Sequence, residues 1–98
     1  MTGAAGFIGA NLARRLLENG VQPYLFVAPG SARWRLAELE DHAPIVEIDL
    51  ADEEGVAAAV ADARADHVFH LAAHGGYSWQ TDHGAILRSI VIGTANLL

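Results

Sequence analysis

The residues whose types and spacing are best suited to chemistry stand at the start of the chain, in the string TGAAGFIG at positions 2–9. Glycine lets a backbone turn tightly and lie close to a diphosphate, and a helix N-terminus supplies unpaired N–H groups and the positive end of the helix dipole. A helix is predicted here because Ile8, Leu12 and Leu16 recur every four residues and Gly20 fits a C-terminal cap. Glycine makes up 10 of the 98 residues. The string alone therefore leaves two interpretations open, a diphosphate-binding loop and a glycine-rich turn that caps a helix.

A second group of candidates follows the predicted strand at 67–71. Open parallel sheets bind ligands beyond the carboxyl ends of their strands. Tyr77, Ser78 and Trp79 in the loop that follows could therefore line a ligand site, and they could equally well only pack that loop.

Three histidines of the same region, at positions 67, 70 and 74, raise the question of a metal ion. No carboxylate ligand is near them, and His70 on a strand is more simply a hydrogen-bonded core histidine. No metal site is predicted.

The elements that must position these residues alternate along the chain. Apolar runs bounded by turn residues predict strands, and periodic apolar segments between them predict helices. Strands are expected at 24–27, 45–48 and 67–71, and helices after the glycine string, at 34–40, after the acidic residues 52–54, and at 82–98. This order indicates an α/β fold with a parallel sheet and helices on both faces. The buried strand that should precede Gly3 is missing, since only Met1 and Thr2 stand before it.

Composition narrows the class of protein. Ninety-eight residues, 52% of them hydrophobic, suit one small domain, 1–98. The net charge of −6 argues against a nucleic-acid partner. There is no cysteine, so no disulfide or thiolate zinc site can form. No apolar stretch is long enough to cross a membrane and the start of the chain does not read as a signal peptide, so a cytoplasmic protein is expected.

Taken whole, residues 2–9 resemble the TGxxGxxG nucleotide loop of the short-chain dehydrogenase/reductase superfamily. The Gly-Phe-Ile-Gly form at 6–9 is typical of its extended branch, the NAD-dependent epimerase/dehydratase family. Three further stretches resemble that family in order and spacing: Asp49-Leu50, VFHLAA at 68–73 and GTANLL at 93–98.

The resemblance implies a partial Rossmann-type, doubly wound parallel sheet of three strands and four helices, cut at both ends, whose absent first strand would lie between 24–27 and 67–71. It also implies the cofactor contacts: Gly3, Gly6, Phe7, Ile8 and Gly9 at the diphosphate, Asp49 and Leu50 at the adenine, and Leu71, Ala72 and Ala73 near the nicotinamide ribose. The parent protein would then be an enzyme that acts by hydride transfer, with a nucleotide-sugar as the expected substrate and a homodimer as a possible assembly.

Two departures from the family concern catalysis. Ile90 stands where the family commonly has Asn. The family's Tyr-x-x-x-Lys pair is also absent, because Tyr24 and Tyr77 are the only tyrosines and there is no lysine. This chain alone is therefore expected to be inactive. The alternatives to part of an enzyme are a non-catalytic dinucleotide-binding module and a non-functional fragment.

The choice between NAD and NADP depends on the end of the strand at 24–27. An acid about 20 residues after the glycines would hold the ribose of NAD, but none occurs between Glu18 and Glu38. Arg33 and Arg35 follow instead, and a guanidinium group can pair with the 2′-phosphate of NADP. This favours NADP by a small margin, with Arg33 as the contact. The alternative is that both arginines only solvate a helix.

Overall fold

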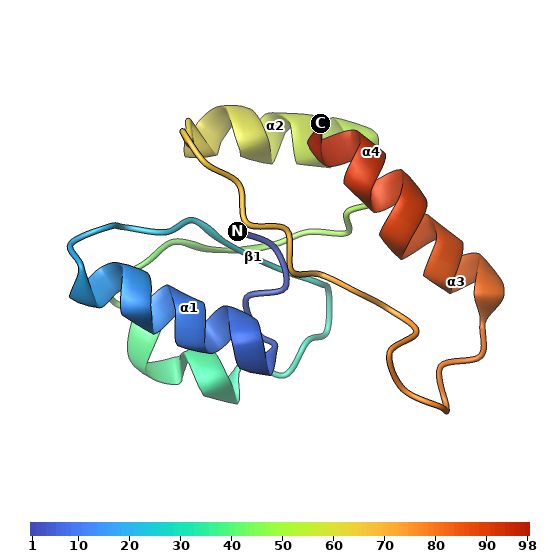
Figure 1. The fold of residues 1–98 in the computed structure, drawn as a ribbon. Coiled ribbons are helices and arrows are strands. Elements are labelled where there is room, and N and C mark those ends of the chain that lie inside the picture. Colours follow the sequence, from blue (N-terminus) through green and yellow to red (C-terminus); the bar gives the residue numbers. More distant parts are fainter.

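The computed structural model describes all residues from Met1 to Leu98. Its elements in chain order are α1 (Phe7–Glu18), β1 (Leu25–Val27), the 3₁₀ helix η1 (Trp34–Leu39), β2 (Ile45–Glu47), α2 (Glu53–Ala63), α3 (His83–Leu87), the π-helical turn η2 (Arg88–Ile92) and α4 (Gly93–Leu97). The last three follow one another without a break and are called here the C-terminal helical segment, residues 83–97 (Figure 1). The predicted α/β class is confirmed, and the elements follow the predicted order except at 67–71, where no strand forms.

The sheet is short and parallel. In it β1 pairs with β2, and Phe26 lies opposite Val46. Thr2 adds single parallel bridges, to Phe26 on one side and to His70 on the other. The spatial order is therefore β2, β1, Thr2, His70, and the direction in which the chain adds neighbours reverses at Thr2. Thr2 occupies the central position predicted for the strand before the glycine loop.

The predicted strand at 67–71 is wrong, so the sheet has two strands and not three. Only His70 makes a bridge, and the backbone adds one hydrogen bond from the Thr2 N–H to the Phe69 carbonyl at 3.0 Å. Val68 and Phe69 are 54% and 42% exposed. The physical reason is that Met1 and Thr2 are the only backbone beside this stretch, and two residues cannot support a longer ladder.

Helix α1 begins and ends as predicted but buries a different face. Its buried residues are Gly9, Ala10 and Ala13, whereas Ile8, predicted on the apolar face, is 67% exposed. Small side chains let the helix axis come close to the backbone beneath it. At the other end, Gly20 has φ +75° and the Val21 N–H donates to the Leu16 carbonyl at 2.9 Å, which is the expected glycine cap.

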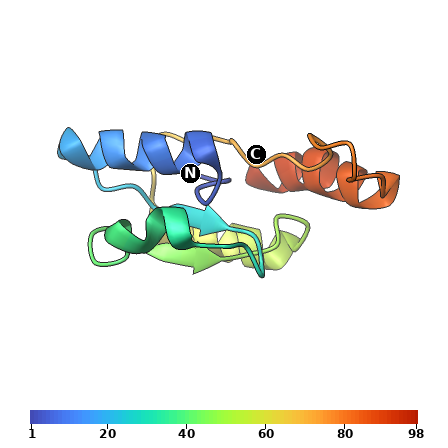
Figure 2. The same ribbon diagram turned by 90° about the horizontal axis from the view of Figure 1, so that it is seen from below.

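The core lies on both faces of the sheet because side chains alternate along β1. Leu25 and Val27 join a cluster with residues of α1 and η1, and Phe26 joins a second cluster with Val56 of α2. Helices therefore cover both faces, as the doubly wound class requires. Figure 2 shows α1 and the C-terminal helical segment lying apart, on either side of the N-terminus.

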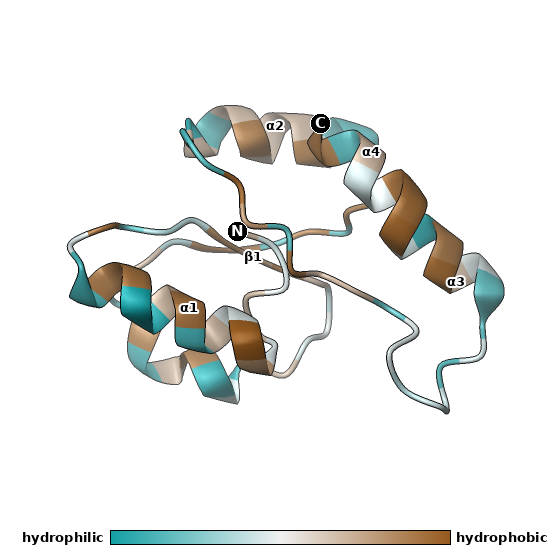
Figure 3. Ribbon diagram, viewed as in Figure 1, coloured by the Kyte–Doolittle hydropathy of each residue, from teal (hydrophilic) through white to brown (hydrophobic).

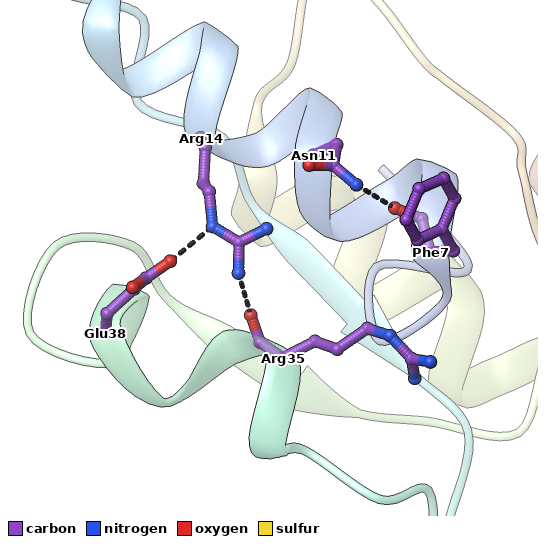
Figure 4. A network of polar contacts seen from close by, with 5 residues as sticks. All are labelled: Phe7, Asn11, Arg14, Arg35 and Glu38. Atoms are coloured by element: carbon purple, nitrogen blue, oxygen red, sulfur yellow. Dashed lines mark hydrogen bonds and ion pairs between the residues drawn. The ribbon is translucent and has the colours of Figure 1, made fainter.

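Polar contacts tie η1 to α1. Arg14 of α1 forms an ion pair with Glu38 and donates from Nη2 to the Arg35 carbonyl at 2.6 Å (Figure 4). Figure 4 also shows the Asn11 side chain bonded back to the Phe7 carbonyl, at 2.8 Å. The two Arg14 contacts hold the middle of α1 against the segment that follows β1, and the Asn11 bond lies within α1.

The C-terminal helical segment is the least covered element. Gly93 is its only buried residue, and Leu87 and Val91 are more than half exposed. Figure 3 shows the resulting hydrophobic stretches along this helix. None of the helices combines the length and the apolar character that crossing a membrane demands.

Candidate functional site

A cavity of about 270 Å³ lies at the carboxyl ends of the strands. It is lined by the glycine loop, the end of β1, the segment after β2, the segment after His70 and one residue of η2: Thr2, Gly3, Ala5, Gly6, Phe26, Val27, Ala28, Ser31, Ile48, Asp49, Leu50, Leu71, Ala72, Ala73, His74 and Ser89. The chain order reverses at Thr2, beside this cavity, and such a switch point is where open α/β sheets bind ligands. Two other hollows, of about 520 and 540 Å³, are more open to solvent and contain no part of the glycine loop.

The glycine loop is shaped by close approaches that only glycine allows. Gly3 has φ +67°, and a Cβ on it would fall 2.6 Å from the Ala72 nitrogen. A Cβ on Gly9 would fall 2.2 Å from the Gly3 carbonyl oxygen, so α1 rests directly on the loop. Gly6 is the N-cap of α1 and has no side chain to occupy the space in front of the helix.

The N-terminus of α1 therefore opens at the cavity with its first N–H groups unsatisfied by the helix itself. No acidic residue occupies the first turn, so nothing in that turn offsets the positive end of the helix dipole. This geometry suits an anion such as a diphosphate.

The structure brings together seven of the eleven residues predicted to bind the cofactor: Gly3, Gly6, Asp49, Leu50, Leu71, Ala72 and Ala73 all line the cavity. Phe7 and Ile8 lie in the first turn of α1, outside the lining, with their side chains 72% and 67% exposed. Gly9 is buried beneath the loop.

Arg33 is the remaining predicted residue, and it lies away from the cavity lining. Its guanidinium group forms an ion pair with Glu47, the last residue of β2. The neighbouring Arg35 lies over the Trp34 ring, 4.1 Å from the ring centre. Both guanidinium groups thus have partners within the chain. Ser31 of the same loop does line the cavity, so this loop reaches the site.

Asp49 offers the cavity a carboxylate. Its Oδ1 accepts a hydrogen bond from the Ala51 N–H at 2.9 Å, and its Oδ2 makes no hydrogen bond within the chain. The side chain is held by the turn that leads into α2, which Asp52 caps by accepting from the Gly55 N–H at 3.2 Å. An acceptor of this kind suits an exocyclic amine.

The loop after His70 contributes only one polar side chain, His74. Its Nδ1 lies 3.2 Å from the Gln80 amide nitrogen, and the Gln80 Oε1 accepts from the Gly75 N–H at 3.0 Å. Tyr77 and Trp79 stack on each other with ring centres 4.6 Å apart, outside the cavity lining. Of the two interpretations of the loop aromatics, packing within the loop describes their position.

Ser89 is a lining residue that sequence reasoning missed. It lies in the π-helical turn, next to Ile90, whose side chain does not line the cavity. No local pattern distinguishes Ser89, because its position depends on how that turn is wound. Ser31 was also missed as a lining residue, whereas Thr2 and His74 belong to segments that had been singled out, the string at 2–9 and the loop after the predicted strand at 67–71.

No three His, Cys, Asp or Glu side chains gather closely enough to hold a metal ion.

Comparison with known proteins places the chain in a family. Residues 1–98 match the NAD dependent epimerase/dehydratase family over their whole length. A Synechocystis protein provisionally named dihydroflavonol 4-reductase is 37% identical over 99 residues, which cover all of this chain and 27% of that protein.

Two solved structures have the same fold over 98% of the chain. UDP-glucose 4-epimerase of Thermus thermophilus, in complex with NAD, superposes with a TM-score of 0.78 at 29% identity, and the chain covers 30% of it. UDP-glucose 4-epimerase of Thermotoga maritima, with UDP-glucose, gives a TM-score of 0.80 at 28% identity and 31% coverage. The chain thus spans about a quarter to a third of the length of these relatives. The predicted family is confirmed: the chain belongs to the NAD-dependent epimerase/dehydratase family.

Proposed function

We propose that residues 1–98 bind NAD(P) in the cavity at the glycine loop, as the dinucleotide-binding part of an epimerase, dehydratase or reductase that acts by hydride transfer. The observation that carries this proposal is the convergence of the glycine loop, the open N-terminus of α1 and Asp49 on one cavity. The Thermus relative, solved with NAD, supports the same cofactor class.

The cofactor's parts fit different walls of the cavity. The first turn of α1 and the backbone at Gly3 and Gly6 would hold the diphosphate, because neither glycine has a side chain to stand between the backbone N–H groups and the ligand. Asp49 would accept a hydrogen bond from the adenine amine through its free oxygen, with Leu50 beside the ring. Ala72 and Ala73 would face the nicotinamide ribose, since their small side chains leave room there.

A nucleotide-sugar is the proposed substrate of the whole protein, by likeness to the two UDP-glucose 4-epimerases. The reductase relative has a higher identity, 37%, and favours reduction of a carbonyl compound as a second candidate. The two differ in stoichiometry. An epimerase returns the hydride to its substrate and consumes no cofactor, whereas a reductase oxidises one NAD(P)H for each product formed. Cofactor absorbance during turnover by the complete open reading frame distinguishes them.

NADP is the proposed cofactor by a small margin, with Arg33 as the residue that meets the 2′-phosphate. The phosphate would have to replace Glu47 as the partner of Arg33. The pair is partly exposed, at 37% and 48% of the two side chains, and an exposed ion pair contributes only about 0–1 kcal/mol. Exchanging one anion for another at this site therefore costs little.

A single substitution separates binding from folding at this site. Phe7 is 72% exposed at the first turn of α1, so Phe7→Glu removes no core contact and places a favourable charge at the helix N-terminus. The same charge would repel the diphosphate. We expect the free energy of unfolding to be unchanged or higher and the dissociation constant for NAD(P)H, measured by fluorescence titration, to rise about tenfold.

Phe7→Gln, of similar size and without charge, is the matched control and should bind almost as the unsubstituted protein does. Equal affinity of the Glu and Gln variants would place the diphosphate elsewhere and refute the proposed site.

A further inference from the structure

A chain of hydrogen bonds crosses the molecule at His70. On one side, Nδ1 of the ring lies 2.6 Å from the hydroxyl of Thr2, which is 1% exposed. On the other side, Nε2 lies 3.0 Å from the hydroxyl of Thr94 in α4. The Thr94 hydroxyl in turn donates to the carbonyl of Ile90 in η2. His70 thus joins the start of the glycine loop to the C-terminal helical segment, across 68 and 24 residues of sequence.

The donor and the acceptor of every hydrogen bond in this network follow from the Ile90 carbonyl at one end of it. A carbonyl can only accept, so the single hydrogen of the Thr94 hydroxyl is used at Ile90. The Thr94 oxygen must then accept from His70, which puts the ring hydrogen on Nε2. Nδ1 is left as an acceptor and takes the hydrogen of the Thr2 hydroxyl. A ring with hydrogens on both nitrogens would leave the buried Thr2 hydrogen without an acceptor.

The Thr2 hydroxyl oxygen, oriented in this way, holds the cavity wall that is formed by Leu71 and Ala72, next to the glycine loop. It accepts hydrogen bonds from the backbone N–H groups of Leu71 and Ala72, both at 3.2 Å. The Ala72 nitrogen is also one of the backbone atoms, together with the Leu71 carbonyl group, against which Gly3 packs without room for a Cβ. The position of Thr2 therefore sets the distance between the glycine loop and the Leu71–Ala72 wall.

We infer that His70 is a positioning residue: with its hydrogen on Nε2, it couples the geometry of the dinucleotide cavity to the C-terminal helical segment through Thr2 and Thr94. The coupling reaches two walls of the cavity, because the π-helical turn that holds the Ile90 carbonyl also carries Ser89. The inference rests on the proposed function only for the identity of the ligand, not for the network itself.

The test removes the Thr94 hydroxyl, at the end of the hydrogen-bond network farthest from the glycine loop, and leaves the cavity lining intact. Thr94 does not line the cavity, and Thr94→Val keeps the size of the side chain while it removes the acceptor of the His70 Nε2 hydrogen. Thr94→Ser keeps the hydroxyl and is the matched control. Both variants are made in the complete open reading frame that contains these residues.

Three readouts are expected to move together. Long-range ¹⁵N–¹H spectra should show the His70 hydrogen on Nε2 in the unsubstituted protein and in Thr94→Ser, and a loss of that tautomer in Thr94→Val. The amide hydrogens of Leu71 and Ala72 should exchange faster in Thr94→Val. The dissociation constant for NAD(P)H should rise about tenfold in Thr94→Val, the equivalent of one net hydrogen bond, and should be restored in Thr94→Ser.

A hydrogen on Nδ1 in the unsubstituted protein would overturn the inference, and so would a Thr94→Val protein that folds with unchanged Leu71 and Ala72 exchange. If Thr94→Val does not fold, the ¹⁵N spectrum of the unsubstituted protein still decides the question, because a hydrogen on Nδ1 overturns the inference by itself. Absence of NAD(P)H binding by the unsubstituted protein would refute the proposed function. The spectra and the exchange rates would then still test the positioning role of His70, because neither measurement needs a ligand.

Discussion

Gly9→Ala should be among the most damaging single-methyl additions in this chain. The added Cβ would lie 2.2 Å from the Gly3 oxygen, 2.8 Å from the Ala4 Cα and 2.9 Å from the Gly3 carbonyl carbon. All three are backbone atoms, so no side chain can rotate away and α1 must move off the loop. Overpacking of this kind costs typically about 1–3 kcal/mol, and we expect the upper end. In a domain of this size a loss of about 3 kcal/mol lowers the melting temperature by roughly 12–24 °C.

The assay is urea unfolding followed by circular dichroism, with NAD(P)H titration on the same samples. Two glycines serve as controls because neither has an atom within 4 Å of an added Cβ. Gly76→Ala should be close to neutral, and Gly20→Ala should cost only the strain of its φ of +75°, about 1–2 kcal/mol. If Gly9→Ala unfolds within about 0.5 kcal/mol of the Gly76 control, the usual range for an uneventful surface change, the close contact between α1 and the loop is refuted.

Three further predictions concern single groups. Asp52→Ala removes the cap of α2 and should lower the free energy of unfolding by about 1 kcal/mol, with Asp52→Ser restoring most of it; equal stability of the Ala and Ser variants would contradict this. In the 98-residue chain, burial lowers the pKa of the Met1 α-amino group from its usual 8.0. Between the folded pKa and 8.0 the unfolded chain binds more protons, so the free energy of unfolding of this chain should rise as the pH rises through that range and fall as the pH drops through the folded pKa. Acetylation of that amine should remove this part of the pH dependence, and an unchanged slope would count against it. Glu47→Gln frees Arg33 and should strengthen NADPH binding relative to NADH, whereas Arg33→Gln should abolish the difference; no change in the ratio would remove Arg33 from the 2′-phosphate site.

Features set by neighbouring residues could be predicted from the sequence. The ends of α1 follow from Gly6 and Gly20, and the start of α2 from Asp52, because caps act within one turn of a helix. The convergence of Gly3, Asp49 and Ala72 could also be predicted, since the ends of parallel strands meet at one edge of a sheet.

Features that depend on what lies opposite in space could not be predicted. Val68 and Phe69 have the composition of a buried strand, but strand formation needs a neighbour longer than Met1 and Thr2. Ile8 fits an apolar stripe, yet the loop beneath α1 admits only small side chains, and these face inward instead. The partner of Arg33 is Glu47, which lies 14 residues away. Pairing of that kind leaves no mark in local spacing.

The double bridge of Thr2 also bears on the order in which the molecule assembles. Contacts of α1 with η1 and of β1 with β2 join residues about 20 positions apart, as in the Leu25–Ile45 pair. Thr2 instead meets His70, 68 positions later, and contacts of long sequence separation form slowly because a large loop must close first. During synthesis the glycine loop leaves the ribosome before the other segments that line the cavity. The Leu71–Ala72 wall cannot pack against this loop until the ribosome has translated the chain past Ala72. The dinucleotide site is therefore completed late, although the glycine loop that identifies it is synthesised before its other parts.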